Sequence, residues 1–171
     1  MKAVLISIQP KWVEKIASGE KTIEVRKSRP KLETPFKCYI YETQGEYKTG
    51  TGIFAYGIEL KGTKKGRGKV IGEFICDRIA GEGETIRGSV CLTEDELIDY
   101  CNGKDLYFWR ISQLKIYDKP KELSEFERPC PYTDGTHCLE NKCEYYGDWT
   151  GVCRCWVERP PQSWCYVEVE R

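Results

Sequence analysis

The stretch SGEKTIEVRK, residues 18–27, joins a turn glycine to a short predicted strand that alternates apolar and charged side chains. Ile23 and Val25 fall on one face of this strand and Glu24 and Arg26 on the other, because successive side chains of a strand point to opposite faces. Alternate residues on one face lie about 6.5–7 Å apart. We therefore expect Glu24 and Arg26 to be neighbours that each reach a ligand without neutralising one another.

Lys21 precedes the strand beside the turn at Gly19, so its long side chain can swing over the same face. The stretch then offers a carboxylate acceptor, a guanidinium fork and a mobile ammonium in one place. The alternative is a solvated strand face with a weak Glu–Arg pair, worth about 0–1 kcal/mol. The pattern alone leaves both interpretations open.

The rest of the chain predicts a mainly β (α+β) fold, a small barrel with two short helices at its rim. Helical spacing from Pro10 predicts the first helix, and a capping box of Thr93 and Glu96 predicts the second, ended by Gly103. Residues 45–69 are rich in glycine and lysine and predict a long mobile loop, with a hairpin as the alternative. Strands are predicted at 4–8, 22–26, 37–43, 70–79, 106–117 (with a bulge) and 164–169.

The composition limits the classes of partner. The 171 residues include 27 basic and 27 acidic ones, so any binding to nucleic acid must use a local patch rather than the field of the whole molecule. No apolar run approaches the roughly 18 residues needed to span a bilayer, and no signal-peptide pattern opens the chain. We expect a cytoplasmic, single-domain protein with no membrane partner.

Residues 19–26 match the GxKxxExR signature of the ASCH domain, a member of the PUA-like superfamily. The preceding strand and helix fit the opening of that domain. Residues 103–111 with 117–120, and residues 161–167, resemble later strands of phage- and prophage-type ASCH proteins. The resemblance covers residues 1 to about 126 and about 160 to 171, and the intervening stretch, about 127–159, is an insertion before the last strand.

This resemblance implies a PUA-like β-barrel with a cleft, and a protein that binds RNA or a modified nucleotide. Lys21, Glu24 and Arg26 would line the cleft, with Ser163 and Trp164 as its wall. Trp164 and three other aromatic residues are candidates for stacking on a base: Tyr41, Tyr107 and Trp109. Residues 61–69, with five basic residues among glycines, predict either a phosphate-gripping loop or a merely solvated one.

Some family members hydrolyse the N4-acyl group of modified cytidine, which gives an enzymatic alternative. In that case Lys21 would be the base and Glu24 a second catalytic residue. The deacylating members carry threonine where this chain has Glu24, and a carboxylate there favours a charged Lys21. Their further glutamate has three candidates in this chain, namely Glu73, Glu94 and Glu96.

Five cysteines and a histidine fall within the insertion, where the turn-rich sequence offers little apolar surface to bury. A loop of this length is not expected to adopt a fixed structure without a cross-link, and a four-coordinate structural zinc would provide one. The predicted ligands are Cys130, Cys138, Cys143 and Cys153, with Cys155 or His137 as substitutes. Free thiols, disulfides and an iron–sulfur cluster are the alternatives. A zinc-bearing insertion would also suit a protein-interaction module, whose partner the sequence does not identify.

Overall fold

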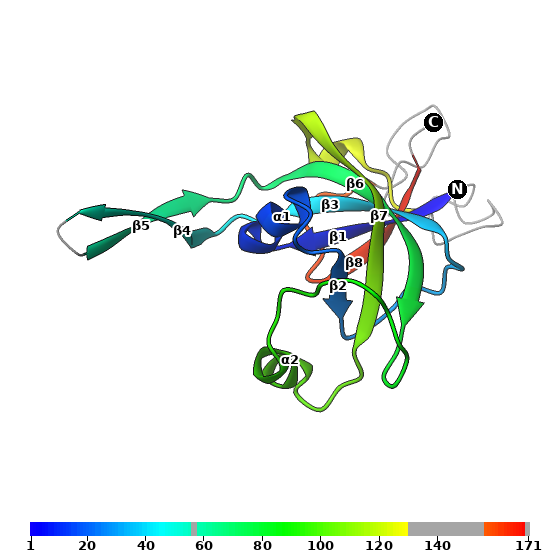
Figure 1. The fold of residues 1–171 in the computed structure, drawn as a ribbon. Helices are drawn as coiled ribbons and strands as arrows, with labels where there is room; N and C mark the ends of the chain where they lie inside the picture. Colours follow the sequence, from blue (N-terminus) through cyan, green and yellow to red (C-terminus); the bar gives the residue numbers. More distant parts are fainter. Residues whose placement is uncertain (56–57, 130–155, 170–171) are drawn as a thin grey trace.

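The computed structural model describes residues 1–55, 58–129 and 156–169 (Figure 1). A six-stranded sheet with the order β2-β7-β6-β3-β1-β8 curls into a half-barrel, and β4 and β5 form a separate two-stranded ribbon. The α-helices are α1 (Pro10–Ala17) and α2 (Glu94–Cys101). The strands are β1 (Lys2–Ile8), β2 (Ile23–Arg26), β3 (Phe36–Glu42), β4 (Glu46–Ala55), β5 (Ile58–Lys65), β6 (Lys69–Ala80), β7 (Tyr107–Lys121) and β8 (Trp164–Glu168).

The strand β1 lies next to the edge strand of the sheet, and it pairs in parallel with β3 and antiparallel with β8. Its residues 3–8 are all buried, because both faces of this strand are covered. One face contributes Val4, Ile6 and Ile8 to a core with Trp109, and the other contributes Ala3 and Leu5 to a second apolar cluster. A continuous apolar run in the sequence is typical of such a two-sided strand.

Two short connections bring the charged strand into place. Pro10 begins α1, where its missing N–H costs no hydrogen bond, and Val13 and Ile16 bury the inner face of the helix. Gly19 then turns the chain with φ +80°, a conformation that favours glycine. The strand β2 starts four residues later and pairs antiparallel with β7. The predicted bulge in β7 is present as register shifts in its pairing with β6.

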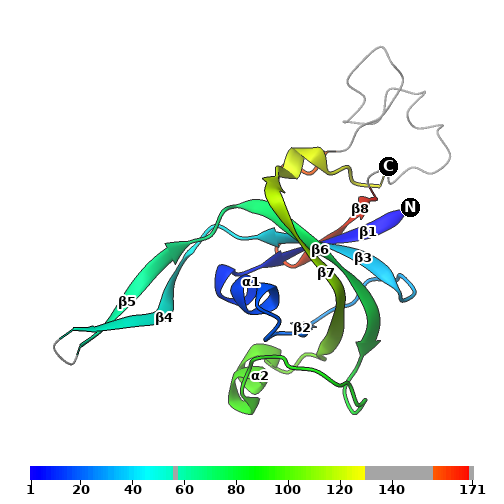
Figure 2. The same cartoon turned by 45° about the horizontal axis from the view of Figure 1, so that its top comes forward.

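The helix α2 lies below α1 and β2, joined to the barrel by two loops (Figure 2). The predicted capping box is present, since Thr93 Oγ1 accepts from the Glu96 N–H and the Glu96 carboxylate accepts from the Thr93 N–H. Asn102, with φ +45°, ends the helix. None of its residues is buried, and Ile98 is 61% exposed. Packing therefore holds α2 less tightly than α1.

Residues 46–65 form an antiparallel hairpin, β4 with β5, that projects from the barrel as an arm (Figures 1 and 2). Of the two alternatives for residues 45–69, the hairpin is therefore the one that forms. Neither α-helix has the length and apolarity of a transmembrane span, as far as the described ranges go.

The predicted insertion leaves and rejoins the barrel at one point. Glu127 and Trp156 form an isolated antiparallel bridge. Next to it, the Val157 N–H donates to Phe126 O at 2.9 Å, and the side chains of Phe126 and Val157 are buried. The cysteines and histidine of the predicted zinc site, residues 130–155, lie outside the described residues. The zinc ligands and the bounds of the insertion stay predictions.

Candidate ligand-binding cleft

An open cleft of about 1350 Å³ runs between α1, the polar face of β2, α2 and the segment before β8. Lys21, Glu24 and Arg26 lie at its floor, and Ser163 lines its wall. The charged face of the opening motif is thus turned into a concavity and not into bulk solvent. The solvated-face interpretation is therefore wrong.

The floor is held in place by pairing on both edges of β2. On one edge Glu24 pairs with Trp109 of β7. On the other, the N–H groups of Thr22 and Ile23 donate to Ser89 O at 2.9 and 3.0 Å. Gly88, with φ +148°, allows this close approach, because a Cβ there would stand 2.7 Å from Thr22 Oγ1. A strand of only four residues is thereby buried along its whole length.

Lys21 is the most buried of the three charged residues, at 3% exposed. Its Nζ donates to Ile23 O at 2.7 Å and to Val90 O at 2.9 Å, and it lies 3.5 Å from Glu24 Oε2. Burial lowers the pKa of Lys21, and the neighbouring Glu24 carboxylate opposes that change. Two backbone carbonyls that accept hydrogen bonds and a nearby carboxylate both suit an ammonium, so these contacts favour the charged form.

Glu24 pairs with both cations, because Arg26 Nη2 lies 3.0 Å from Glu24 Oε1. The expectation that Glu24 and Arg26 avoid neutralising each other is wrong, since their long side chains bend together across the spacing of alternate strand residues. Arg26 Nη2 also donates to Ser7 O at 2.6 Å, which ties the floor to β1.

Two polar atoms of this ion cluster have no hydrogen-bond partner within the described part of the chain. These are Glu24 Oε2 and Arg26 Nε, both fully buried. The 3.5 Å from Glu24 Oε2 to Lys21 Nζ is long for a hydrogen bond. A buried polar atom without a partner costs about 1–3 kcal/mol. The floor therefore keeps one buried acceptor and one buried donor without a partner.

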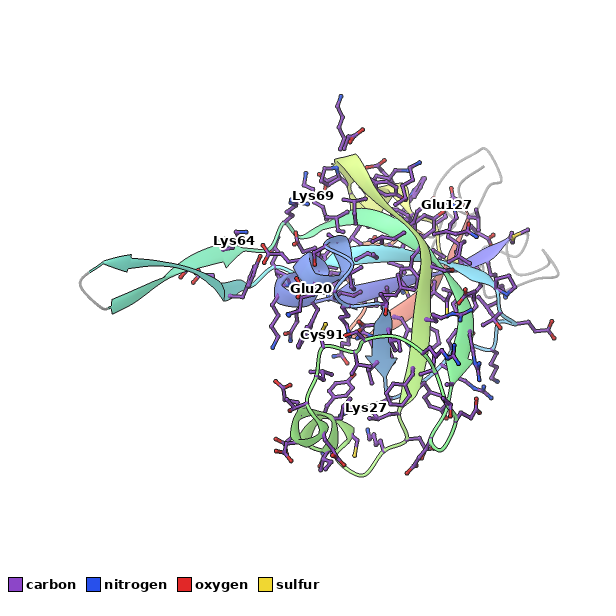
Figure 3. The ribbon with its side chains drawn as sticks, viewed as in Figure 1. Glu20, Lys27, Lys64, Lys69, Cys91 and Glu127 are labelled. Atoms are coloured by element: carbon purple, nitrogen blue, oxygen red, sulfur yellow. The ribbon has the colours of Figure 1, made fainter. Side chains whose placement is uncertain are left out.

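Aromatic side chains stand on two walls of the cleft. Trp12 of α1 lies under Lys11, whose Nζ is 4.3 Å from the ring centroid, and Tyr100 of α2 lies 4.7 Å from Lys27 Nζ. Figure 3 shows Lys27 near the end of β2. In the sequence, Trp12 is one of the apolar residues at helical spacing that predict α1. Helical spacing does not separate it from Val13 and Ile16, which bury the inner face of α1.

The predicted stacking residues lie elsewhere for the most part. Trp109 is fully buried in the core and unavailable to a ligand. Trp164 packs on Trp109 and Tyr166, at centroid distances of 6.1 and 5.4 Å, and its Nε1 donates to Ser28 Oγ. It is not among the residues that line the cleft, whereas Tyr41 is, although it is only 4% exposed.

The three candidate glutamates separate clearly. Glu96 lines the cleft from α2. Glu73 lies away from it on β6, where its carboxylate pairs with Lys37 at 3.2 Å and accepts from Tyr117 Oη at 2.6 Å. Glu94 is exposed in the first turn of α2. Of the three, only Glu96 can reach a ligand held over Lys21.

Metal binding by the rest of the described chain has no support. In residues 1–55, 58–129 and 156–169, no group of three or more His, Cys, Asp or Glu side chains is arranged to hold an ion. Cys91 lies beside the start of β2 (Figure 3), with its Sγ 3.4 Å from Ser89 Oγ.

Comparisons with known proteins agree with this architecture. The family model of the ASCH domain matches residues 6–94. The crystal structure of ASCH from Zymomonas mobilis is similar, with a TM-score of 0.54 and 18% identity over 97% of this chain and 87% of that chain. A tyrosine-to-phenylalanine mutant of that protein gives a TM-score of 0.57 and 18% identity over 98% and 91%. The search of curated proteins found no match.

Proposed function

This chain belongs to the ASCH domain family, and on that premise we propose that its cleft binds RNA as a short single-stranded segment. Its fold is the PUA-like half-barrel of that family. At the level of the family, membership supports a domain that binds nucleic acid or nucleotides, or one related to hydrolases. The finer assignment rests on the geometry of the cleft.

One observation carries the proposal: an open cleft whose buried floor holds an unpartnered donor and an unpartnered acceptor. The Watson–Crick edge of each nucleobase presents donors and acceptors side by side, so a base seated on the floor can satisfy both atoms once the Glu24 and Arg26 side chains turn toward it. The surrounding cations, Lys11, Lys27 and Lys104, suit the phosphates of the same ligand.

The size of the cleft favours a strand over a free nucleoside. Pockets for small molecules usually enclose about 300–1,000 Å³ and bury most of the ligand. This cleft exceeds that range, at about 1350 Å³, and is open to solvent. Trp12 and Tyr100 on separate walls offer a stacking surface to more than one base, and each stacked base is worth about 1–3 kcal/mol.

The contacts of Lys21 favour binding over acyl hydrolysis. A lysine that acts as a base must be neutral, and a neutral Lys21 would leave the buried Glu24 carboxylate with only one of its two cationic neighbours. Lys21 is therefore a positioning residue that joins β2 to the loop at Val90. Lys21 and Glu24 would be catalytic only in the hydrolase alternative, which the lowered pKa of Lys21 and the place of Glu96 in the cleft favour.

The test uses a labelled tetranucleotide and fluorescence anisotropy. Trp12→Ala is expected to weaken binding by roughly 10- to 100-fold, the loss of one stacking contact. Trp156→Ala, a half-exposed tryptophan outside the cleft, is the matched control and should bind like wild type. Equal affinities for all three proteins would overturn the proposal. Release of cytidine from N4-acetylcytidine, lost in Lys21→Ala, would establish the hydrolase instead.

We also propose that Cys130, Cys138, Cys143 and Cys153 hold a structural zinc, with Cys155 or His137 as substitutes. The support is the sequence pattern together with the fixed base at Glu127 and Trp156, between which a metal would close the segment. Elemental analysis of the purified protein should give about one zinc per chain. Less than half an equivalent, with these thiols freely reactive in the folded protein, would overturn the proposal.

A further inference from the structure

The arm formed by β4 and β5 starts at the rim of the cleft. Thr43 and Gln44 line the cleft, and β4 begins at Glu46, directly after them. The ten residues of β4, at about 3.4 Å each, carry the arm roughly 30 Å from the rim. Figures 1 and 2 show it clear of the barrel in both views. A strand that leaves the cleft on this side therefore meets the arm.

Charge is divided unequally between the arm and the barrel. Residues 46–67, the arm with the first two residues after β5, hold five of the 27 basic residues and two of the 27 acidic ones, a net charge of +3, which leaves −3 on the remainder of the chain. A polyanion is repelled by the net charge of the remainder and attracted by that of this segment. The neutrality of the whole molecule conceals this separation.

Several contacts attach the base of the arm to the barrel and hold its direction. Lys64 Nζ pairs with Glu14 of α1 at 2.6 Å, and Gly66 N–H donates to Gly45 O at 2.8 Å. The buried Glu42 carboxylate accepts from the Arg67 backbone N–H at 2.9 Å. Lys69 pairs with Glu122. These contacts engage backbone N–H groups at the base of the arm and neutralise Lys64 and Lys69.

Two cations at this base remain available. Lys65 is exposed, with no ion-pair partner in the part of the chain that the structure describes. The Arg67 side chain is 57% exposed, and its Nε lies 3.8 Å from Glu42, at the limit of an ion pair. A two-stranded ribbon without a supporting layer is marginally stable in water, so a partner that covers the arm would stabilise it.

We propose that the base of the β4–β5 arm is a second nucleic-acid contact, in which Lys65, at the end of β5, and Arg67, just after it, bind the phosphate backbone of a single strand that leaves the cleft. The inference rests on the proposed function of the cleft and extends it. It predicts a site that spans more nucleotides than the cleft holds and that reads no sequence, because phosphate contacts position a strand without specifying its bases.

The experiment compares a tetranucleotide with a 20-nucleotide single-stranded RNA at several salt concentrations, using the full chain. The double variant Lys65→Gln/Arg67→Gln leaves the Arg67 backbone bond to Glu42 intact. For the long RNA we expect the slope of log affinity against log salt to become shallower by about 1.4, because each phosphate contact on a single strand contributes about 0.7. Tetranucleotide binding should be unchanged.

The matched control is Lys31→Gln/Arg78→Gln, which removes the same charge from two exposed residues outside the cleft and the arm. An equal loss in both double variants would reduce the effect to net charge and overturn the proposal, as would an unchanged slope in Lys65→Gln/Arg67→Gln. A change of oligomeric state in that variant, measured by light scattering, would overturn it in favour of self-association. Tetranucleotide binding that depends on Trp12 keeps the cleft proposal standing in each of these cases.

Discussion

Replacing Glu24 by glutamine tests whether the floor of the cleft is a mutually dependent ion cluster. Glu24 is 6% exposed and lies 3.0 Å from Arg26 and 3.5 Å from Lys21. Glu24→Gln keeps the shape of the side chain but leaves two buried cations without a counterion. Breaking a buried pair in this way typically costs about 3–5 kcal/mol. For a chain of this size, that corresponds to a fall in Tm of roughly 6–20 °C.

The measurement is urea unfolding followed by tryptophan fluorescence, with Glu20→Gln as the matched control. Glu20 also pairs with a lysine, Lys15 at 3.1 Å, but its side chain is 60% exposed and solvent screens the pair. We expect no measurable change for Glu20→Gln. A Glu24→Gln variant as stable as this control would refute the reasoning, because the cluster would then contribute no more than a surface pair.

A double-mutant cycle adds a second check. If Glu24 and Lys21 stabilise each other, Lys21→Met combined with Glu24→Gln should lose less free energy of unfolding than the sum of the two single variants. Contacting residues of this kind usually show a coupling of about 0.5–3 kcal/mol. Strict additivity would mean that Lys21 is held by its two backbone carbonyls alone.

Three further outcomes are expected. Gly66→Ala should cost about 1–3 kcal/mol in urea unfolding, since its Cβ would stand 2.0 Å from Thr43 O, whereas Gly45→Ala has no neighbour within 4 Å and should match wild type. Burial raises the pKa of Cys76 from 9.0 to about 12. The protonated thiol therefore contributes its full stability below pH 9, and the free energy of unfolding falls by about 1.4 kcal/mol per pH unit above it. In Cys76→Ala the fall of the free energy of unfolding with pH should be smaller by the part that one proton contributes. Thr93→Ala should weaken α2 by about 0.5–2 kcal/mol, seen as faster amide exchange in α2 and unchanged exchange in α1.

The elements that the sequence predicted well are those encoded by short-range patterns. Pro10, Gly19 and the capping box at Thr93 each fix a local backbone conformation through groups a few residues apart. The alternation in β2 correctly placed its charged residues on one face. Local geometry was sufficient in each case, and the signature at residues 19–26 supplied the fold.

What the sequence missed depends on contacts between distant segments. The bending of Glu24 toward Arg26 accompanies the burial of both side chains, which strand spacing cannot express. The aromatic walls were misassigned for the same reason, since Trp109 looks equivalent to Trp12 until the sheet register places it in the core. Whether residues 46–65 pair as a hairpin also depended on a register that glycine-rich strands specify weakly.

The bridge between Glu127 and Trp156 has a consequence for how this protein can vary. Phe126 and Val157 are hydrogen-bonded to each other and belong to the same apolar cluster. The segment between them therefore begins and ends at almost the same point of the barrel. Such an attachment lets the intervening stretch be shortened, lengthened or exchanged while β8 keeps its pairing with β1. The barrel can thus carry different attachments at this position without redesigning its own interior.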